Sequence, residues 1–197
     1  MAMSGESVSN ENERTTSRSA PFIFTQPHVT HDEGTSAPAA MMLVVDLTAD
    51  ERTKSRHYFE AHLESQRDPD LKQGGTPNTD AQKYGIYVRL PRGTVLRHND
   101  YLTTADKDAI LRIVAKPEPV MTAIAPDPHL LLKAAYHLGN RHVELEVNLN
   151  YLRFSPDPVL KQMVEQMGLN ITEATLPFQP EAGAYANHGS HSHHHDH

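Results

Sequence analysis

The sequence predicts an α+β protein, made of a small all-β N-terminal domain and a second domain of order βαββαβ. Three observations lead to this prediction. Short runs of β-branched and apolar residues alternate with turn signals through the first half of the chain, whereas two later segments repeat apolar residues at helical spacing. The chain also contains no cysteine, so packing alone must hold the fold.

Residues 1–40 are predicted to be a disordered N-terminal segment. They are rich in Ser, Thr, Glu, Asn and Pro, and their one apolar island, Phe22-Ile23-Phe24, buries too little surface to offset the entropy of ordering the segment. His28 and His31 lie here and could add weak metal contacts, although solvated loop histidines are the simpler interpretation.

Residues 41–118 are predicted to form the all-β domain, with a surface loop inserted over residues 65–83. The expected strands are Met41–Leu47, Tyr58–Leu63, Gly85–Leu90, Thr94–Leu96 and Ala109–Val114. Turns are expected at Pro91-Arg92-Gly93 and His98-Asn99-Asp100. The basic cluster from Arg52 to Arg56 is interpreted as a solvated turn, with a docking surface as the alternative. Pro117-Glu118-Pro119 indicates the domain boundary.

Residues 119–178 are predicted to form the second domain. Asp127 and Pro128 supply an N-cap and a proline at the first helical position, and Gly139 is expected to end this helix in the left-handed conformation. A second helix is expected to begin within Ser155-Pro156-Asp157-Pro158 and to end at Gly168. The expected strands are Val120–Ile124, Val143–Val147, Tyr151–Phe154 and Asn170–Leu176. This order is that of a ferredoxin-like domain, with both helices on one face of an antiparallel sheet.

Composition excludes several classes of function. No Lys/Arg stripe stands out in a chain of formal charge −7, so nucleic acid is not an expected partner. No apolar run approaches the roughly 18 residues of a membrane span, and the polar start lacks the apolar core of a signal peptide, so a cytoplasmic location is expected. The catalytic motifs of hydrolases and phosphate-binding enzymes are absent, which argues against an enzyme.

Residues 179–197 are predicted to be a flexible tail, and its histidines point to metal. The tail histidines are His188, His191, His193, His194, His195 and His197. Imidazole nitrogen suits Ni, Cu or Zn, and Gly and Ser spacers let several rings approach one ion. A purification tag is the alternative, but Ser and Asp interrupt the run and no linker precedes it.

Several motifs together resemble one family. They are Leu90-Pro91-Arg92-Gly93-Thr94-Val95-Leu96-Arg97, Ala115-Lys116-Pro117-Glu118, Ala134-Ala135-Tyr136-His137-Leu138-Gly139-Asn140-Arg141-His142, Asp157-Pro158-Val159-Leu160 and the segment from Pro177 to Tyr185. In this order, and with the histidine-rich end, they resemble the UreE family of urease accessory proteins, which are nickel metallochaperones. The resemblance covers residues 41–197 apart from the 65–83 loop.

The resemblance implies a β domain for partner contact and a metal-binding domain that forms a homodimer, with higher oligomers in the presence of metal left open. It implies Ni²⁺ shared between protomers by His142, and the urease apoprotein complex and the urease accessory GTPase as partners. Two imidazoles cannot complete a nickel site of roughly four to six ligands, so tail histidines or water must supply the others. His137 is a possible auxiliary ligand, although a capping or packing role is the simpler interpretation. Zn²⁺ or Cu²⁺ could substitute, since the same nitrogens bind them.

One stretch departs from the family. Some members carry additional histidines in the segment that corresponds to Arg153–Leu160, where this chain has Pro156 and Pro158. Because proline has no side-chain ligand, no peripheral metal site is expected there. Two alternatives to delivery remain open: a histidine-rich metal sink and a partner-binding adaptor.

Overall fold

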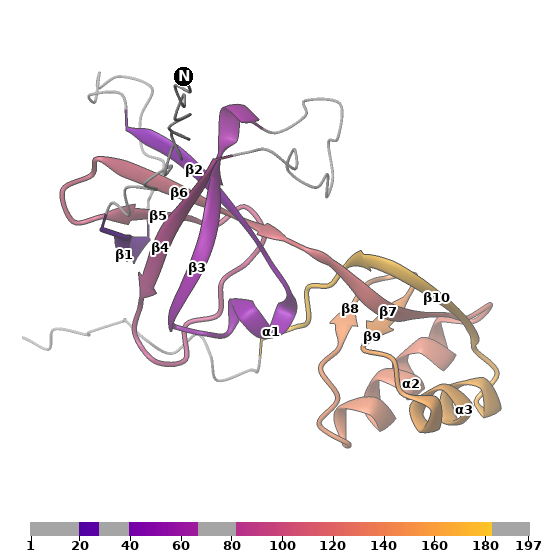
Figure 1. The fold of residues 1–197 in the computed structure, drawn as a ribbon. Coiled ribbons are helices and arrows are strands. Elements are labelled where there is room, and N and C mark those ends of the chain that lie inside the picture. Colours follow the sequence, from indigo (N-terminus) through magenta and orange to yellow (C-terminus); the bar gives the residue numbers. More distant parts are fainter. Residues whose placement is uncertain (1–19, 28–39, 67–81, 183–197) are drawn as a thin grey trace, which may run out of the picture.

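The computed structural model describes residues 20–27, 40–66 and 82–182, and it confirms the mixed α+β class. Its strands form a closed barrel, in the order β1-β4-β3-β2-β6-β5, and a four-stranded sheet, in the order β10-β7-β9-β8 (Figure 1). The elements of the barrel are β1 (Phe22–Pro27), β2 (Met41–Leu47), α1 (Ala49–Arg52), β3 (Arg56–Leu63), η1 (Glu64–Gln66), β4 (Lys83–Arg89), β5 (Tyr101–Thr104) and β6 (Ala109–Ala115). Those of the second unit are β7 (Pro117–Ile124), α2 (Pro128–Gly139), β8 (Glu146–Val147), β9 (Leu152–Phe154), α3 (Pro158–Gln166) and β10 (Asn170–Pro177).

Alternate residues of the barrel strands face its interior and form one hydrophobic core. The most buried of them include Phe24, Leu43, Ile86, Leu111 and Ile113. β2 pairs with β6 and β1 with β4 in parallel, while the other neighbours are antiparallel. Strands from distant parts of the sequence therefore close the barrel.

The expectation of disorder throughout residues 1–40 is wrong for the Phe22–Phe24 island. This island begins β1, which lies between β4 and β5 and pairs with both. Phe24 is completely buried in the barrel core. Burial of such a side chain contributes roughly 1.5–3 kcal/mol, and pairing on both sides satisfies the strand's backbone groups. Residues 1–19 and 28–39, with His28 and His31, lie outside the described residues.

One local expectation in the barrel is also wrong. Thr94–Leu96 is a loop rather than a strand, because Gly93 at φ 82° turns the chain and Leu96 donates its backbone N–H to the Arg52 carbonyl instead of joining a ladder. The strand in this region is β5, which begins at Tyr101. The 65–83 loop is described only at its ends, by η1 and the start of β4.

The cluster expected to be a solvated turn contains a buried arginine. Thr48 caps α1, and its hydroxyl and Glu51 form a reciprocal capping box. Arg52, at the end of this short helix, is only 3% exposed and donates hydrogen bonds to the carbonyls of Thr48 and Phe178. Burial lowers the pKa of Arg52 below its ordinary value, and the carboxylates of Glu118 and Glu146 oppose this shift.

The second unit follows the barrel directly, because only Lys116 separates β6 from β7. Pro117, Glu118 and Pro119, expected at a boundary, instead begin β7, which pairs with β10 along its whole length. β9 pairs only with Met121–Ala123, so the two prolines lie where β7 has a single neighbour and their missing N–H groups break no second ladder.

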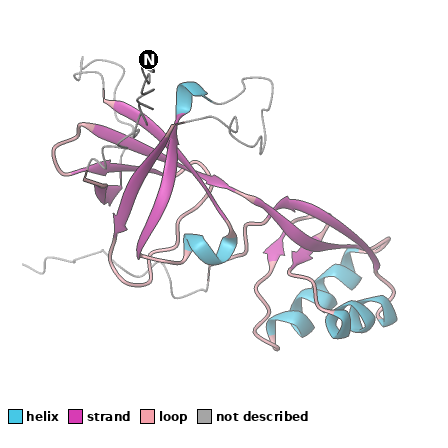
Figure 2. Cartoon of the chain, in the orientation of Figure 1, coloured by secondary structure: helices cyan, strands magenta, loops and turns pink. Residues whose placement is uncertain are grey.

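Both longer helices lie on the same side of the four-stranded sheet (Figure 1, Figure 2). Their apolar faces bury Leu131, Ala134, Leu138 and Val164 against Leu152 and Phe154 of β9 and its neighbours. α3 begins at Asp157 as N-cap, so only Pro158 lies in its first turn and Pro156 precedes the helix. None of the described helices is long and apolar enough to span a membrane.

The chain after β10 returns to the barrel. Phe178, 1% exposed, packs with Ala49 and Val120 in a small cluster where the two units meet. Its carbonyl accepts the hydrogen bond from Arg52, and Glu118 of β7 accepts one from the Ala49 backbone at 2.7 Å. These contacts tie α1 of the barrel to the ends of β7 and β10.

We expect Arg52→Met to lower the free energy of unfolding by about 1–3 kcal/mol, because it leaves the buried Phe178 carbonyl without its donor. Urea denaturation followed by circular dichroism measures the change. Arg92→Met, at an exposed position of the 91–93 turn, is the matched control and should change stability by less than about 0.5 kcal/mol. Equal effects of the two substitutions would contradict the role of Arg52.

Candidate metal site

The two candidate ligands among the described residues lie at the C-terminal end of α2, His137 in its last turn and His142 three residues beyond it. Asp127 caps the helix by accepting the His129 N–H at 2.9 Å, and Pro128 occupies the first helical position. Leu131, Ala134 and Leu138 bury one side of the helix. The last turn of α2 is therefore anchored to the core of the second unit.

The helix ends in a Schellman arrangement, with His142 as its left-handed residue. The Val143 N–H donates to the Leu138 carbonyl at 3.2 Å, and the His142 N–H donates to the Gly139 carbonyl at 2.9 Å. His142 has φ 58°, whereas Gly139 is still helical. The expectation that Gly139 adopts the left-handed conformation is thus wrong, because the chain continues one more turn before it reverses.

A histidine at this position is unusual for physical reasons. Glycine normally takes the left-handed place, since the side chain of an L-residue there costs roughly 1–2 kcal/mol. Strain of this kind is concentrated at functional positions. His142 is also exposed, so its imidazole is available to an ion from solvent. The fold holds the turn through one hydrogen bond of the His142 backbone and one of the Val143 backbone, and it leaves the His142 side chain exposed.

His137 lies one turn before the helix end and is exposed as well. Its ring meets that of Tyr136 edge to face at a centroid distance of 5.4 Å, and its carbonyl accepts a hydrogen bond from Arg141. Within the described residues no three His, Asp or Glu side chains gather as a ready-made metal site. His142 and His137 are therefore open positions that need further ligands.

The first turn of α3 offers no imidazole. Asp157 is engaged as the N-cap and accepts the N–H groups of Val159 and Leu160, at 2.8 and 2.9 Å. Pro156 and Pro158 flank it. The absence of a peripheral metal site at this turn stays a prediction.

The six tail histidines from His188 to His197 lie outside the described residues, but the start of their segment is fixed close to the His142 turn. Glu181 donates its N–H to the Leu145 carbonyl at 2.8 Å, three residues beyond His142. Gln179 donates to Glu146 at 2.8 Å and accepts from the His98 N–H at 3.1 Å. The contacts of Gln179 and Glu181 were not predicted from the sequence, because they join distant residues. The short helix that carries Arg52 was also not predicted, although the Thr48-x-x-Glu51 capping box is a local signal for it.

Glu146 is the centre of a half-buried polar network beneath this segment. It pairs with Arg153 at 3.0 Å and accepts the Tyr151 hydroxyl at 2.8 Å, while Arg153 also donates to the Pro177 carbonyl. Burial, and then the hydrogen bond to Glu146, raise the pKa of Tyr151. Tyr151 consequently stays protonated and keeps donating to the carboxylate throughout the neutral range.

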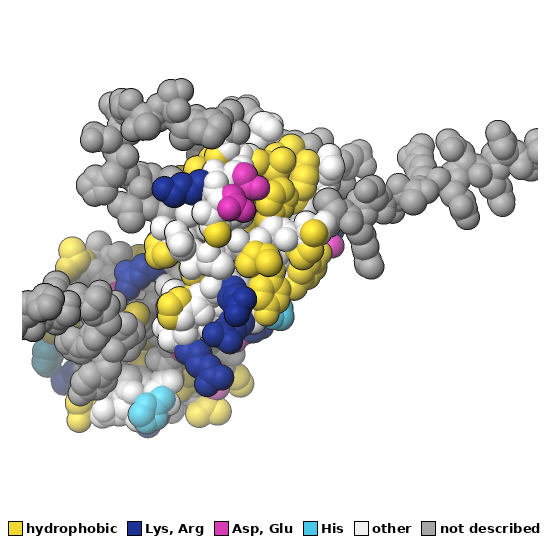
Figure 3. Space-filling view, turned by 90° about the vertical axis from the view of Figure 1, so that its left-hand side faces the viewer, with side chains coloured by type: hydrophobic (Ala, Val, Ile, Leu, Met, Phe, Trp, Pro, Cys, Tyr) yellow, Lys and Arg dark blue, Asp and Glu magenta, His cyan; other side chains and the backbone are white. Residues whose placement is uncertain are grey.

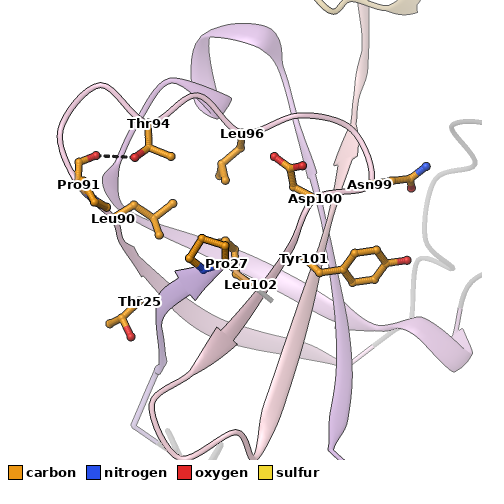
Figure 4. A pocket seen from close by; sticks show the side chains of 10 residues that line it. All are labelled: Thr25, Pro27, Leu90, Pro91, Thr94, Leu96, Asn99, Asp100, Tyr101 and Leu102. Atoms are coloured by element: carbon orange, nitrogen blue, oxygen red, sulfur yellow. Dashed lines mark hydrogen bonds between the residues drawn. The ribbon is translucent and has the colours of Figure 1, made fainter. Parts of the chain in front are cut away.

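A separate cavity of about 500 Å³ opens at one end of the barrel (Figure 4). Its lining is mainly apolar, with Leu90 and Leu96 directed into it and Asp100 as its one charged side chain. Asp100 already accepts the Arg97 N–H at 2.6 Å. With a single carboxylate and no histidine, this cavity lacks the ligands of a transition-metal site.

Comparison with known proteins gives a consistent family. A family model described as the C-terminal domain of the UreE urease accessory protein matches residues 118–197. The urease accessory protein UreE of Nostoc sp. (strain PCC 7120) is 48% identical over 152 residues, which is 77% of this chain and 90% of the relative. The protein of the same name from Microcystis aeruginosa is 42% identical over 166 residues, 84% of this chain and 89% of the relative. That from Acinetobacter baumannii is 45% identical over 157 residues, covering 80% and 85% of the two chains.

The strain at His142 predicts an order of stabilities. We expect metal-free His142→Gly to be more stable than His142→Ala by about 1 kcal/mol, because only glycine adopts φ 58° at little cost. Urea denaturation in a chelator measures both. Gly168→Ala is the matched control. Gly168 has φ 91°, and an added Cβ would make only an ordinary contact with Leu130 at 3.8 Å, so this substitution should lower the free energy of unfolding by a similar amount. Equal stability of the two His142 variants would contradict the strained assignment.

Proposed function

The chain belongs to the UreE family of urease accessory proteins, and from this premise we propose that it is a nickel metallochaperone. In this proposal it binds Ni²⁺ and delivers it to the urease apoprotein complex or to the urease accessory GTPase, for assembly of the urease metallocentre. The names of the relatives, urease accessory proteins, support a role in urease maturation. The ion, its delivery and the cytoplasmic location are part of the proposal.

The observation that carries the proposal is the position of His142. His142 is a strained left-handed residue, exposed and held by its own backbone hydrogen bond and that of Val143, and it is costly in a turn that glycine would stabilise. Such a cost is consistent with selection for the imidazole itself. His142 is therefore the principal ligand, and His137 an auxiliary one.

The remaining ligands come from a second protomer and from the tail. Because no described group of three ligands surrounds His142, two protomers related by a two-fold axis would supply two imidazoles. Leu132 and Tyr136, 69% and 66% exposed, lie one turn apart on α2 beside this site and form an apolar stripe suited to a dimer contact.

The tail can reach the site by length alone. The described chain ends at Ala182, one residue after the hydrogen bond between Glu181 and Leu145. His188 follows six residues later, so an extended chain places it up to roughly 20 Å from Ala182. Leu145 itself is only three residues, at most roughly 10 Å, from His142. His188, His191, His193, His194, His195 and His197 can thus complete the coordination or exchange the ion.

The family supplies the choice of Ni²⁺, since imidazole ligands bind Cu²⁺ more tightly and Zn²⁺ comparably. Delivery requires ligands that exchange, and a tail of repeated histidines provides them. A metal sink would need the tail but not His142. This difference separates delivery from the alternative.

We predict that truncation after Ala186 lowers the number of nickel ions bound but leaves one tight ion per dimer. His142→Ala in the full chain should remove that tight ion, because no other described ligand replaces it. Isothermal titration calorimetry with Ni²⁺, and with Zn²⁺ for comparison, measures both. His129→Ala, an exposed histidine at the other end of α2, is the matched control and should bind as the wild type. Unchanged tight binding in His142→Ala would establish the metal sink instead, and metal-dependent turnover lost in this variant would indicate an enzyme.

The proposed dimer contact gives a second prediction. Tyr136→Asp places a charge on the exposed apolar stripe of α2 and should shift the apo protein from dimer to monomer in analytical ultracentrifugation. Val159→Asp is the control, since Val159 is 72% exposed on α3. A dimer that persists in Tyr136→Asp would place the interface elsewhere.

A further inference from the structure

The outer surface of the barrel carries an exposed aromatic row that the metal site does not use. On this surface Ile23 of β1 lies opposite Tyr87 of β4, and Tyr87 lies opposite Tyr58 of β3. Inward positions of the same strands belong to the core, so these three side chains face outward. Ile23 is 49% and Tyr58 51% exposed.

Two arginines flank this row without any acidic partner. Arg56 of β3 is directly opposite Arg89 of β4, and both are exposed. The ion pairs within the described part of the chain involve Lys54, Lys83, Arg112, Arg153 and Lys161, but neither of these two arginines. Like charges directly opposite each other destabilise a strand pair. In a chain with 25 acidic and 18 basic residues, this uncompensated pair is unexpected for a surface that meets only water.

The backbone beneath the row is shaped to let an aromatic ring lie flat. A Cβ atom at Gly85 would lie 2.5 Å from the Tyr58 hydroxyl oxygen and 3.1 Å from its ring. The ring therefore covers the glycine, which also protects the backbone of β4. Tyr58 is thus held in a fixed place while half of it stays exposed.

We propose that Ile23, Tyr58, Tyr87, Arg56 and Arg89, called here the Tyr–Arg face, dock an acidic surface of a protein partner. Tyrosine and arginine are the residues most enriched at the energetic centres of protein interfaces. Figure 3, which looks at the barrel side of the molecule, shows that Lys and Arg side chains lie next to hydrophobic ones on that side. The excess positive charge selects an acidic partner, since an opposite potential steers the encounter and suppresses wrong partners.

A protein partner fits this face better than nucleic acid. The overall charge of −7 repels a polyanion at long range, and two arginines make few phosphate contacts. The inference rests on the proposed function for the identity of the partner, which is the urease accessory GTPase. It does not depend on His142, because the face and the metal site lie on different units (Figure 1).

The test measures binding of the purified accessory GTPase to the full chain without metal, by biolayer interferometry at low and moderate salt. We expect Arg89→Glu and Tyr58→Ala each to weaken binding by about tenfold or more, with the Arg89 effect shrinking as salt increases. Lys107→Glu, an equal charge change at the exposed β5–β6 turn, should leave binding unchanged.

Arg56→Glu separates docking from folding. It replaces a like-charge pair by an opposite-charge pair with Arg89, so its melting temperature should equal or exceed that of the wild type. Its GTPase binding should nevertheless fall by about tenfold. A stable variant that loses binding cannot be explained by unfolding.

The outcomes distinguish this inference from the proposed function. GTPase binding that all face variants retain would overturn the Tyr–Arg face while leaving nickel delivery intact. No binding by the wild type would also overturn it, whereas nickel titration of His142→Ala decides the metal site separately. If the face variants lost binding to a single-stranded RNA oligomer but kept GTPase binding, the Tyr–Arg face would be a nucleic-acid site and the proposal of a protein partner would be overturned.

Discussion

The hydrogen bond from buried Arg52 to the Phe178 carbonyl is the contact on which the arrangement of the molecule depends. It joins the short helix after β2 to the segment that leaves β10, so it spans 126 positions of sequence. With Phe178 packed on Ala49 and Val120, it directs the following residues back along the junction, where Glu181 reaches the Leu145 carbonyl. The start of the segment that leads to the histidines is therefore set by a charged side chain in the barrel rather than by the second unit alone.

The His142 turn shows a second constraint, in which stability and chemistry oppose each other. A Schellman turn closes α2 whether its left-handed residue is glycine or histidine, but glycine closes it at lower cost. The left-handed residue that ends α3 is a glycine, Gly168 at φ 91°, which adopts this conformation at little cost. The same unit thus contains one helix end with a glycine in the left-handed position and one with a histidine there, whose backbone is strained. This contrast within one fold is a stronger argument for a functional His142 than exposure or position after a helix.

Sequence patterns predicted elements wherever local signals suffice, and failed where distant pairing decides. Asp127, Pro128 and Gly168 mark the two helices correctly because caps act within a few residues. β1 could not be predicted, since Phe24 becomes buried only when β4 and β5 close around it. The prediction that Gly139 ends α2 in the left-handed conformation failed. Residue type shows which position tolerates that conformation, but tertiary packing decides where the helix ends. For the site, motif and resemblance point to His142, and its role as a ligand stays a prediction. The anchoring of Glu181 beside Leu145 is a tertiary contact without a local signature.

Rigidity of the junction bears on how delivery could work. Lys116 is the single residue between β6 and β7, and the contacts of Arg52, Glu118 and Phe178 cross the same boundary, so a hinge between the two units would have to break buried hydrogen bonds. A partner docked on the barrel would then be held in a constant relation to His142, because the barrel and the metal unit move together. In the proposed delivery, the repeated imidazoles beyond Ala182 would then be the groups that exchange the ion one ligand at a time. In that proposal the described units would fix the position of His142 relative to the partner, and the tail histidines would supply the ligands that exchange.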